Sequence, residues 1–482
     1  MKLSEYAKYD GLGLAELVRK KKISAKELTL TAASAIEKAN PEINGVVETY
    51  PDRIEGLDEK SLGKGPFHGV PFLIKDVFGH EKGRKIEFGS RLCKGMVADT
   101  DSNVAILLRK AGVNILGRSF APEYSMAGTG EGLLYGNAST PWKKGWSTGG
   151  SSGGAQAAVT SGMVPLAHGS DIGGSLRIPA SYCGGVGFKP SRMRISVGPT
   201  VDEGGFGYSM NFVQAKSMRD AATMLDCLAI PMVGDPFIIP KPNRSYAVLA
   251  KRPPKTLRVG IVLDPLLGVA VDPEVSKAVM KTAKTLAAMG HRVEPASFGF
   301  GGVDLLATTR DIFFFDFDNR LNGYAKKAGT RPGPDTLEPA IWSVYQRAKE
   351  ITPSRFMAAW SNANIARRSM GQFWTKYDIL LSPTTATTSV PWGTINLSRP
   401  GADFDTLGST VFATPVQFTL PHNFMGTPAI SLPLVMHSNG LPIGVQIAAA
   451  PSLDHIVLQV ATALEQAMPW NRRVPPLHVS KL

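Results

Sequence analysis

The order of apolar and polar positions predicts helices and strands that follow one another along the chain. Near the N-terminus, four apolar residues recur with helical spacing: Leu28, Ala32, Ala35 and Ile36. They follow a capping-box sequence that begins at Ser24, and we expect their helix to end just before Pro41. The short apolar run over residues 69–77, GVPFLIKDV, predicts a buried strand.

The alternation continues through most of the chain. Residues 103–111 have the pattern of a helix that ends at Gly112, and residues 113–116 then predict a strand. Further elements are expected: a small-residue helix over 153–162, strands over 163–168 and 257–263, and a helix from Asp272 and Pro273 towards Gly290. Residues 421–447 are expected to combine turns with short apolar strands that rejoin the main sheet. Residues 231–254 form either a linker or a surface excursion. This succession is typical of an α/β fold.

Composition narrows the class of protein. The 482 residues are 43% hydrophobic and 19% charged, which indicates a globular chain and excludes a disordered one. No apolar run is long enough to predict a membrane helix, and the start, MKLSEYAKYD, lacks the apolar region of a secretory signal. Three cysteines, Cys93, Cys183 and Cys227, exclude a disulfide scaffold and have no metal-like spacing. We expect a cytoplasmic protein with no metal site and no membrane contact.

The net charge of +13 raises the question of an anionic partner. It comes from 53 basic and 40 acidic residues, a balance that nucleic-acid-binding proteins often share. The basic residues are scattered, however, and the dense runs cover only residues 19–22 and 251–255. Neither run is interleaved with the aromatic residues that stack on bases in nucleic-acid sites. We expect a solvated basic surface and no nucleic-acid partner.

The glycine- and serine-rich stretch over residues 135–199 carries the main chemical signal. Ser151 and Ser152 lie in the sequence GGSSGG, and Ser175 ends the sequence DIGGS. Glycines let the backbone turn sharply beside a substrate, and consecutive N–H groups in such a turn can converge on an oxyanion. A P-loop is excluded because no Gly-Lys-Ser/Thr sequence follows. These serines are therefore candidate nucleophiles.

A serine nucleophile needs a group that takes its proton. Candidates for a Ser-His-Asp triad include His68, His168 and His422, but the chain has no Gly-x-Ser-x-Gly elbow. Lys75 is another candidate, since burial in the run 69–77 would lower its pKa. It could instead be a strand-end lysine paired with a carboxylate such as Asp76, although neighbouring strand residues point to opposite faces. The residues alone leave both interpretations open.

Residues 149–191, GGSSGGAQAAVTSGMVPLAHGSDIGGSLRIPASYCGGVGFKPS, resemble the signature of the amidase signature family of serine hydrolases. The spacing agrees, because Ser151 lies 24 residues before Ser175 and 76 residues after Lys75. The sequences DILLSPT, from Asp378, and PHNFMGTPAISLPLVMHSNGLPIGVQ, from Pro421, resemble the C-terminal blocks of the family. The likeness extends from the first helix to Pro469.

The resemblance implies a fold and a domain organisation. Members of the family have a large mixed, twisted β-sheet covered by helices on both faces, and we expect this α/β fold here. Residues 1–482 would form a single domain. Within it, residues 65–200 would hold the signature core, residues 201–375 a more variable substrate-pocket region, and residues 376–470 the part that rejoins the sheet.

The resemblance also implies a mechanism without a metal or a cofactor. Carried over to this chain, Ser175 is the nucleophile, and Ser151, which the family holds by a cis peptide bond, bridges Ser175 and a neutral Lys75. Protons pass from Ser175 to Ser151 and from Ser151 to Lys75, and one returns to the departing amine. The oxyanion hole consists of four backbone N–H groups, those of Ile172, Gly173, Gly174 and Ser175. Water then hydrolyses the acyl-enzyme through the same relay.

Other residues match family positions that do not take part in the chemical steps. Ser152, Asp171 and Arg177 match positions that orient the serines and the glycine turn, although Asp171 and Arg177 could equally form a purely structural ion pair. Cys183 is expected to pack in the core. Met126 matches a substrate-facing position, with core packing as the alternative. The phenylalanine-rich segment 311–318 is expected to form either an aromatic pocket wall or a buried helix.

Within the family the chain is most similar to stand-alone bacterial amidases that open nylon-type cyclic oligoamides or cleave aryl amides and carbamates. We therefore expect an amidohydrolase acting on a small-molecule amide, ester or carbamate, and the sequence leaves a homodimer open. One alternative is an A-type amidotransferase subunit that acts on glutamine for tRNA-dependent amidation. An alternative of another class is a non-catalytic binding or assembly subunit that keeps the fold.

Overall fold

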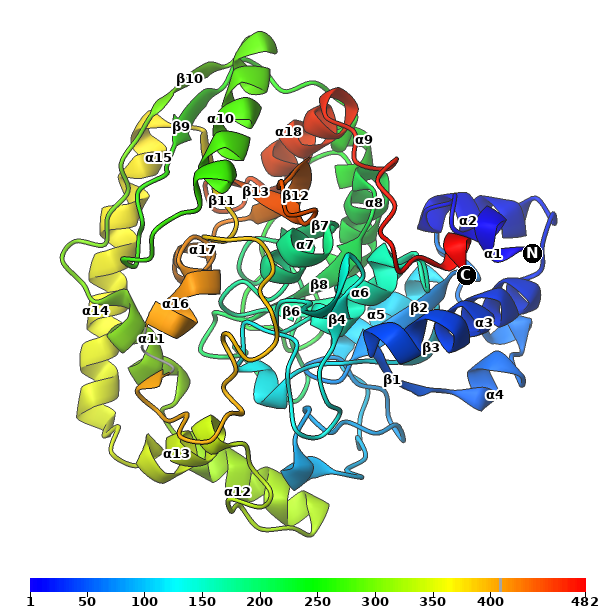
Figure 1. The fold of residues 1–482 in the computed structure, drawn as a ribbon, viewed down its shortest axis with the longest axis horizontal. Helices are drawn as coiled ribbons and strands as arrows, with labels where there is room; N and C mark the ends of the chain where they lie inside the picture. The colour runs from blue at the N-terminus through cyan, green and yellow to red at the C-terminus, as the bar shows by residue number, and fades with distance from the viewer. Residues whose placement is uncertain (407–409) are drawn as a thin grey trace.

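The computed structural model describes residues 1–406 and 410–482, and at its centre lies a mixed β-sheet of eleven strands (Figure 1). Across the sheet the order is β1 (Val46–Thr49), β3 (Asn114–Ser119), β2 (Pro71–Lys75), β6 (Leu166–Asp171), β8 (Met210–Ala215), β7 (Val186–Lys189), β12 (Ala429–Met436), β13 (Pro442–Ala449), β11 (Ile379–Pro383), β9 (Arg258–Ile261) and β10 (Arg292–Pro295). A separate ribbon pairs β4 (Ser139–Thr140) with β5 (Lys143–Ser147). Strands from distant parts of the sequence therefore share one sheet.

The sheet combines parallel and antiparallel pairs. β2 runs parallel to both β3 and β6, and β9 runs parallel to both β10 and β11. Between these groups, the strands β8, β7, β12 and β13 pair antiparallel with their neighbours. Because β2 and β6 are parallel, their last residues, Lys75 and Asp171, lie at the same edge of the sheet.

Helices cover both faces of the sheet, as the sequence predicted. In β11, Ile379 and Leu381 belong to the largest apolar core, whereas Leu380 packs with Phe373 on the other face. The first face is covered by α3 (Ala25–Ile43), α5 (Asn103–Ala111), α8 (Met218–Leu228), α10 (Pro273–Ala288) and α18 (Asp454–Ala467). The second carries α15 (Phe373–Lys376).

The remaining helices surround this core. α6 (Gly153–Thr160) packs against β6, and α7 (Arg177–Cys183) packs against β7, β12 and β13. α16 (Thr410–Val416) and α17 (Leu420–Met425) lie between β11 and β12 in the sequence. At the end of the molecule away from the termini lie α11 (Leu305–Phe313), α12 (Phe317–Ala328), α13 (Pro339–Ala348) and α14 (Pro353–Gly371) (Figure 1). Short helices complete the chain: α1 (Leu3–Tyr6), α2 (Gly11–Arg19), α4 (Pro51–Ile54) and α9 (Tyr246–Ala250). The C-terminal residues return to α1, so the two termini are neighbours (Figure 1).

Most elements lie near the places that the sequence predicted, but several boundaries differ, among them those of β3, β6 and α3. α5 has the predicted bounds, with Gly112 as a left-handed cap. α3 continues past Pro41 to Ile43, because a proline in the last turn removes only one backbone donor while Ile43 is buried in the core. The strand predicted over 163–168 is β6, which begins at Leu166 because pairing with β8 sets its register.

Residues 231–254 form a surface excursion that is tied to the body of the protein. Arg194 donates hydrogen bonds to the carbonyl oxygens of Ile239 and Pro240. Asp226 accepts from the N–H groups of Tyr246 and Ala247 at the start of α9. These bonds fix both halves of the segment, which excludes a free linker.

Candidate active site

Lys75 ends strand β2 and is fully buried. Its Nζ donates to two serine hydroxyls, Ser151 Oγ at 2.7 Å and Ser170 Oγ at 2.9 Å. The first contact joins two residues that the sequence predicted as catalytic partners. Ser170 was not singled out, although its place directly before Asp171 in a buried strand could have indicated it.

The buried position of Lys75 favours a neutral amine. Burial lowers the pKa of Lys75 to about 7, against an upward pull from the charges of Asp171 and Asp76. Asp76 lies on the other side of the strand, where Arg118 pairs with it and the N–H groups of Glu87 and Gly89 donate to it. In the described part of the chain Lys75 forms no ion pair, so the alternative of a Lys75–Asp76 pair is not what the structure contains.

The segment around Ser151 is packed tightly between two loops. The Gly150–Ser151 peptide bond is cis, and a Cβ on Gly150 would collide with the carbonyl oxygen of Ala127. The Ser152 hydroxyl donates to the Ser170 carbonyl oxygen and accepts from the Ser170 N–H, each at 3.1 Å. The Ser152 N–H donates to the Ser175 carbonyl oxygen at 3.2 Å. These contacts hold Ser151 beside both the end of β6 and the turn that carries Ser175.

Asp171 organises the turn from β6 to α7 that presents Ser175. Its carboxylate accepts from the N–H of Gly174 at 2.8 Å and from that of Leu176 at 3.1 Å. Arg177 binds the same carboxylate through two nitrogens, at 3.0 and 2.8 Å. Burial alone would raise the pKa of Asp171, but the charge and hydrogen bonds of Arg177 lower it to about 2. The pair predicted from the sequence is therefore an ionised, fully buried ion pair.

The same turn carries the predicted oxyanion donors. The Gly174 N–H is engaged by Asp171, which leaves it less available than the others. For the N–H groups of Ile172, Gly173 and Ser175, the described residues provide no protein acceptor. Ser175 itself is buried but retains 7% of its exposure, unlike the fully buried Ser151 and Lys75.

None of the three candidate histidines reaches either serine. Within the described residues, His168 bonds the Lys75 N–H and Asn211, His422 bonds Thr427, and His68 bonds the Gly63 carbonyl oxygen. Burial lowers the pKa of His168 to about 3 and that of His422 well below its usual value. Among the described residues, the titratable side chain that hydrogen-bonds Ser151 is Lys75, and not a histidine.

Residues of the C-terminal block hold the Asp171–Arg177 pair in place. Arg177 donates to the Thr419 carbonyl oxygen at 2.8 Å and to the Gln446 side chain at 2.9 Å. The Asn423 amide nitrogen donates to the Asp171 carboxylate at 2.9 Å. The sequence could not predict this role, because contacts across more than 240 residues leave no local pattern in the chain.

The residues proposed for packing or for contact with substrate lie in apolar surroundings. Met126 packs against an apolar cluster that includes Tyr124 and Phe404. Cys183 is buried, donates to the Thr148 carbonyl oxygen and has its pKa raised by burial to about 12, which fits a packing role. Segment 311–318 is not one buried helix but the junction of α11 and α12.

The phenylalanines of that junction divide into two groups. Phe314 and Phe317 are buried in the same cluster as Tyr124, whereas Phe315 is half-buried and stacks on Phe356 with ring centres 4.4 Å apart. The segment therefore supplies both a core element and a partly open aromatic surface.

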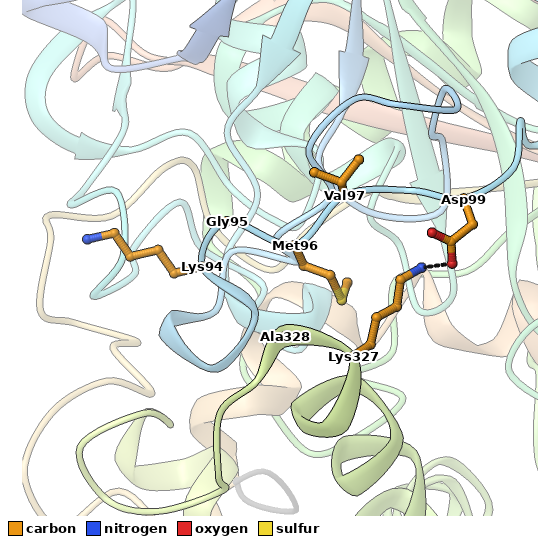
Figure 2. A pocket seen from close by; sticks show the side chains of 7 residues that line it. All are labelled: Lys94, Gly95, Met96, Val97, Asp99, Lys327 and Ala328. Carbon is orange, nitrogen blue, oxygen red and sulfur yellow. Dashed lines mark hydrogen bonds and ion pairs between the residues drawn. The ribbon is translucent and has the colours of Figure 1, made fainter.

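A surface pocket of about 390 Å³ lies away from these residues (Figure 2). In this view Lys94 lies at one end, the ion pair between Asp99 and Lys327 lies at the other, and Met96 and Val97 lie between them. None of the predicted site residues lines it. Within the described residues, no group of His, Cys, Asp or Glu side chains could hold a metal ion, and no helix has the length and apolar character to cross a bilayer.

Comparison with known proteins agrees with the geometry. Residues 27–458 match the family model for amidases. The chain is 36% identical over 481 residues to the 6-aminohexanoate-cyclic-dimer hydrolase of Paenarthrobacter ureafaciens, covering 97% of this chain and 96% of that protein. It is 30% identical to an acylamidase of Rhodococcus erythropolis, covering 96% of each.

Solved structures give the same result. The structure of 6-aminohexanoate cyclic dimer hydrolase complexed with substrate superposes with a TM-score of 0.92 at 35% identity, over 98% of this chain and 99% of that one. A bacterial aryl acylamidase, at 24% identity and a TM-score of 0.86, shares the fold. The chain thus belongs to the amidase signature family and is an amidohydrolase that acts on cyclic or linear amides.

Proposed function

We propose that the protein cleaves an amide bond through the triad Ser175–Ser151–Lys75 and an acyl-enzyme intermediate. The observation that carries the proposal is the 2.7 Å contact between Lys75 Nζ and Ser151 Oγ, made by a buried lysine whose pKa lies near 7. A neutral Lys75 can take the Ser151 proton while Ser151 takes that of Ser175, so that Ser175 Oγ attacks the amide carbonyl carbon.

The return of the proton completes the first half of the reaction. Lys75 gives its proton back to Ser151, and the amine leaving group receives one as the carbon–nitrogen bond breaks. The acyl group then stays on Ser175 as an ester. A water molecule that loses its proton to the same relay hydrolyses this ester and releases the carboxylate.

The negative charge of the tetrahedral intermediate is placed next to the Asp171–Ser175 turn. The N–H groups of Ile172, Gly173 and Ser175 have no acceptor among the described residues and can donate to this oxyanion. The Gly174 N–H contributes indirectly, through its bond to Asp171 that fixes the turn. Asp171, Arg177 and Ser152 are thus proposed to position the reacting groups without contacting the substrate.

For the substrate we propose a small cyclic or linear oligoamide of the nylon type, with aryl amides, esters and carbamates as further candidates. The oligoamide proposal follows the similarity to a hydrolase of the cyclic dimer of 6-aminohexanoate, and the aryl amide follows the similarity to an aryl acylamidase. The apolar surroundings of Met126 fit an aliphatic chain, and Met126 is proposed to face it. A homodimer and a cytoplasmic location stay predictions.

Covalent labelling tests the triad directly. The folded wild-type protein should react with a serine-directed fluorophosphonate, and mass spectrometry should place the adduct on the peptide that contains Ser175. The Ser175→Ala variant should not be labelled. An adduct on Ser151 or Cys183 would overturn the assignment, and a folded protein that is never labelled would favour a non-catalytic subunit.

A substrate panel separates hydrolysis from amidotransfer. The purified chain alone should hydrolyse nylon-type oligoamides, anilides or carbamates. An amidotransferase subunit should instead act on glutamine and depend on partner subunits. Its solved counterpart from Thermotoga maritima shares the fold at 23% identity.

A further inference from the structure

The peptide unit between Gly173 and Gly174 is held at both of its ends. Its carbonyl oxygen, on Gly173, accepts a hydrogen bond from Thr419 Oγ1 at 2.6 Å. Its N–H, on Gly174, donates to Asp171 Oδ1 at 2.8 Å. The carbonyl and the N–H of a planar trans peptide point in opposite directions, so these two bonds fix the rotation of the whole unit.

This peptide unit lies in the middle of the proposed oxyanion hole. The N–H groups on either side of it, those of Gly173 and Ser175, have no acceptor in the described part of the chain. A change in ψ of Gly173 or in φ of Gly174, the two torsions at the ends of this unit, would change the angle between the N–H groups of Gly173 and Ser175 and turn them away from a common point. The direction of the free donors therefore depends on the two bonds that hold the central unit.

Thr419 is itself held in place from several sides. It is fully buried, and its carbonyl oxygen accepts from Arg177 at 2.8 Å. Asn423, one turn later in α17, binds Asp171 at both its carbonyl oxygen and its carboxylate. Gly174 has a φ of +137°, and a Cβ there would collide with Thr419 Oγ1. The threonine hydroxyl thus fits closely against a backbone that only glycine adopts easily.

We infer that Thr419 is a positioning residue for the oxyanion hole, acting through the Gly173–Gly174 peptide unit. Its hydroxyl completes a clamp of which Asp171 is the other half, and a residue 246 positions after Gly173 thereby sets the direction of the donors that stabilise the transition state. The inference rests on the proposed function, because it requires an oxyanion on the acyl group of Ser175.

The test compares Thr419→Val, which keeps the shape and loses the hydroxyl, with Thr419→Ser, which keeps the hydroxyl. The valine variant should lower kcat by about 10- to 100-fold, less than the loss of an oxyanion donor itself, while KM stays nearly unchanged. The serine variant should recover most of kcat. Thr282→Val is the matched control, since Thr282 is also fully buried and donates to a carbonyl oxygen, that of Ala278 in α10.

A trifluoromethyl ketone, which forms an oxyanion on the serine, provides a second readout. Its inhibition constant should rise in Thr419→Val in proportion to the loss of kcat/KM, as expected for a group that acts in the transition state. If Thr419 served stability alone, Thr419→Val would lower the melting temperature and leave both the inhibition constant and kcat/KM unchanged. If the valine variant does not fold, Thr419→Ala is assayed in the same way.

Three outcomes overturn the inference. The first is a Thr419→Val enzyme with the kcat of wild type, and the second is a serine variant as impaired as the valine variant. The third is a loss confined to KM or to melting temperature while trifluoromethyl ketone affinity is retained. A wild-type protein that neither hydrolyses amides nor reacts with a fluorophosphonate would instead overturn the proposed function, and the inference with it.

Discussion

Two fully buried lysines, Lys75 and Lys189, end strands β2 and β7 of the same sheet. Burial lowers the pKa of each to about 7. The Nζ of Lys75 contacts two serine hydroxyls, whereas that of Lys189 donates to the carbonyl oxygen of Pro190 at 3.0 Å. A carbonyl oxygen has no proton to give, so only Lys75 has a hydroxyl that it can deprotonate.

The charges around the two lysines also differ. Carboxylates oppose the effect of burial at both lysines, but at Lys189 the charges of Arg177 and Arg192 also add to it. Both amines nevertheless reach the same pKa, because desolvation is the largest effect at each. A lowered pKa therefore makes a lysine able to act as a base, and the neighbouring group decides whether it does.

Replacing each lysine by methionine should produce the largest contrast. Lys75→Met should lower kcat/KM by about 10³- to 10⁴-fold, near the upper end of what general base catalysis contributes. Lys75→Arg should not restore it, because arginine cannot give up its proton. Lys189→Met should lose less than about tenfold, since Lys189 touches no reacting group. Steady-state kinetics on a neutral anilide measures all three, and equal losses in both methionine variants would contradict the comparison.

The pH profile should carry the signature of Lys75 alone. Protonated Lys75 cannot accept the Ser151 proton, so kcat/KM should fall about tenfold per pH unit below pH 7 and stay high at alkaline pH. The measurement is kcat/KM for an uncharged substrate across this range. Lys189→Met serves as the control, and its profile should have the same midpoint as that of wild type. A shifted midpoint in this variant would show that Lys189, and not Lys75, is the group that titrates.

Ser170→Ala should have a smaller effect on the rate and on the kinetic pKa of Lys75. It removes one of the two hydroxyls that Lys75 Nζ contacts, and the loss of a single hydrogen bond corresponds to about a 3- to 10-fold change in rate. Because a lysine donates through its charged form, the kinetic pKa should also move to lower pH. Ser161→Ala, which removes a buried hydroxyl bonded to the Ala158 carbonyl oxygen, is the control. A profile identical to that of wild type would exclude a role for Ser170.

Stability should respond alike to both lysines. Their pKa values fall from 10.5 to about 7 on folding, so between these pH values the unfolded chain binds one more proton per lysine. The free energy of unfolding should therefore rise with pH in this window, by about 1.4 kcal/mol per pH unit for each lysine. Either Lys→Met variant should remove one such contribution. Urea unfolding at several pH values measures the slopes, and unequal changes would show that only one of the amines is neutral in the fold.

The pattern of apolar residues placed much of the secondary structure correctly. The helix over residues 103–111 has its predicted bounds, because its cap, apolar face and final glycine all lie within a few residues of one another. α3 was extended past Pro41 by the burial of Ile43, a tertiary contact that outweighs the local signal of a proline. β6 was placed too early because its last residues, Ser170 and Asp171, are polar but buried in the site.

For Lys75, the sequence predicted the environment of the side chain but not its hydrogen-bond partner. An apolar run around a lysine indicated burial and a lowered pKa, and both are present. The same pattern left open whether the amine meets a carboxylate or a hydroxyl. Resemblance to a family then paired Lys75 with Ser151, and the hydrogen bond between them is in the structure.

The sequence by itself determined the α/β class, most element positions and the residue types of the site, because these depend on local periodicity and short motifs. Only the tertiary structure decided which partners meet. Parallel pairing of β2 with β6 brings Lys75 to Ser170, and the return of α17 brings Thr419 and Asn423 to the turn of Ser175. Such contacts join residues up to 252 positions apart. Their energy comes from packing and from the burial of paired polar groups, which no local pattern in the chain records.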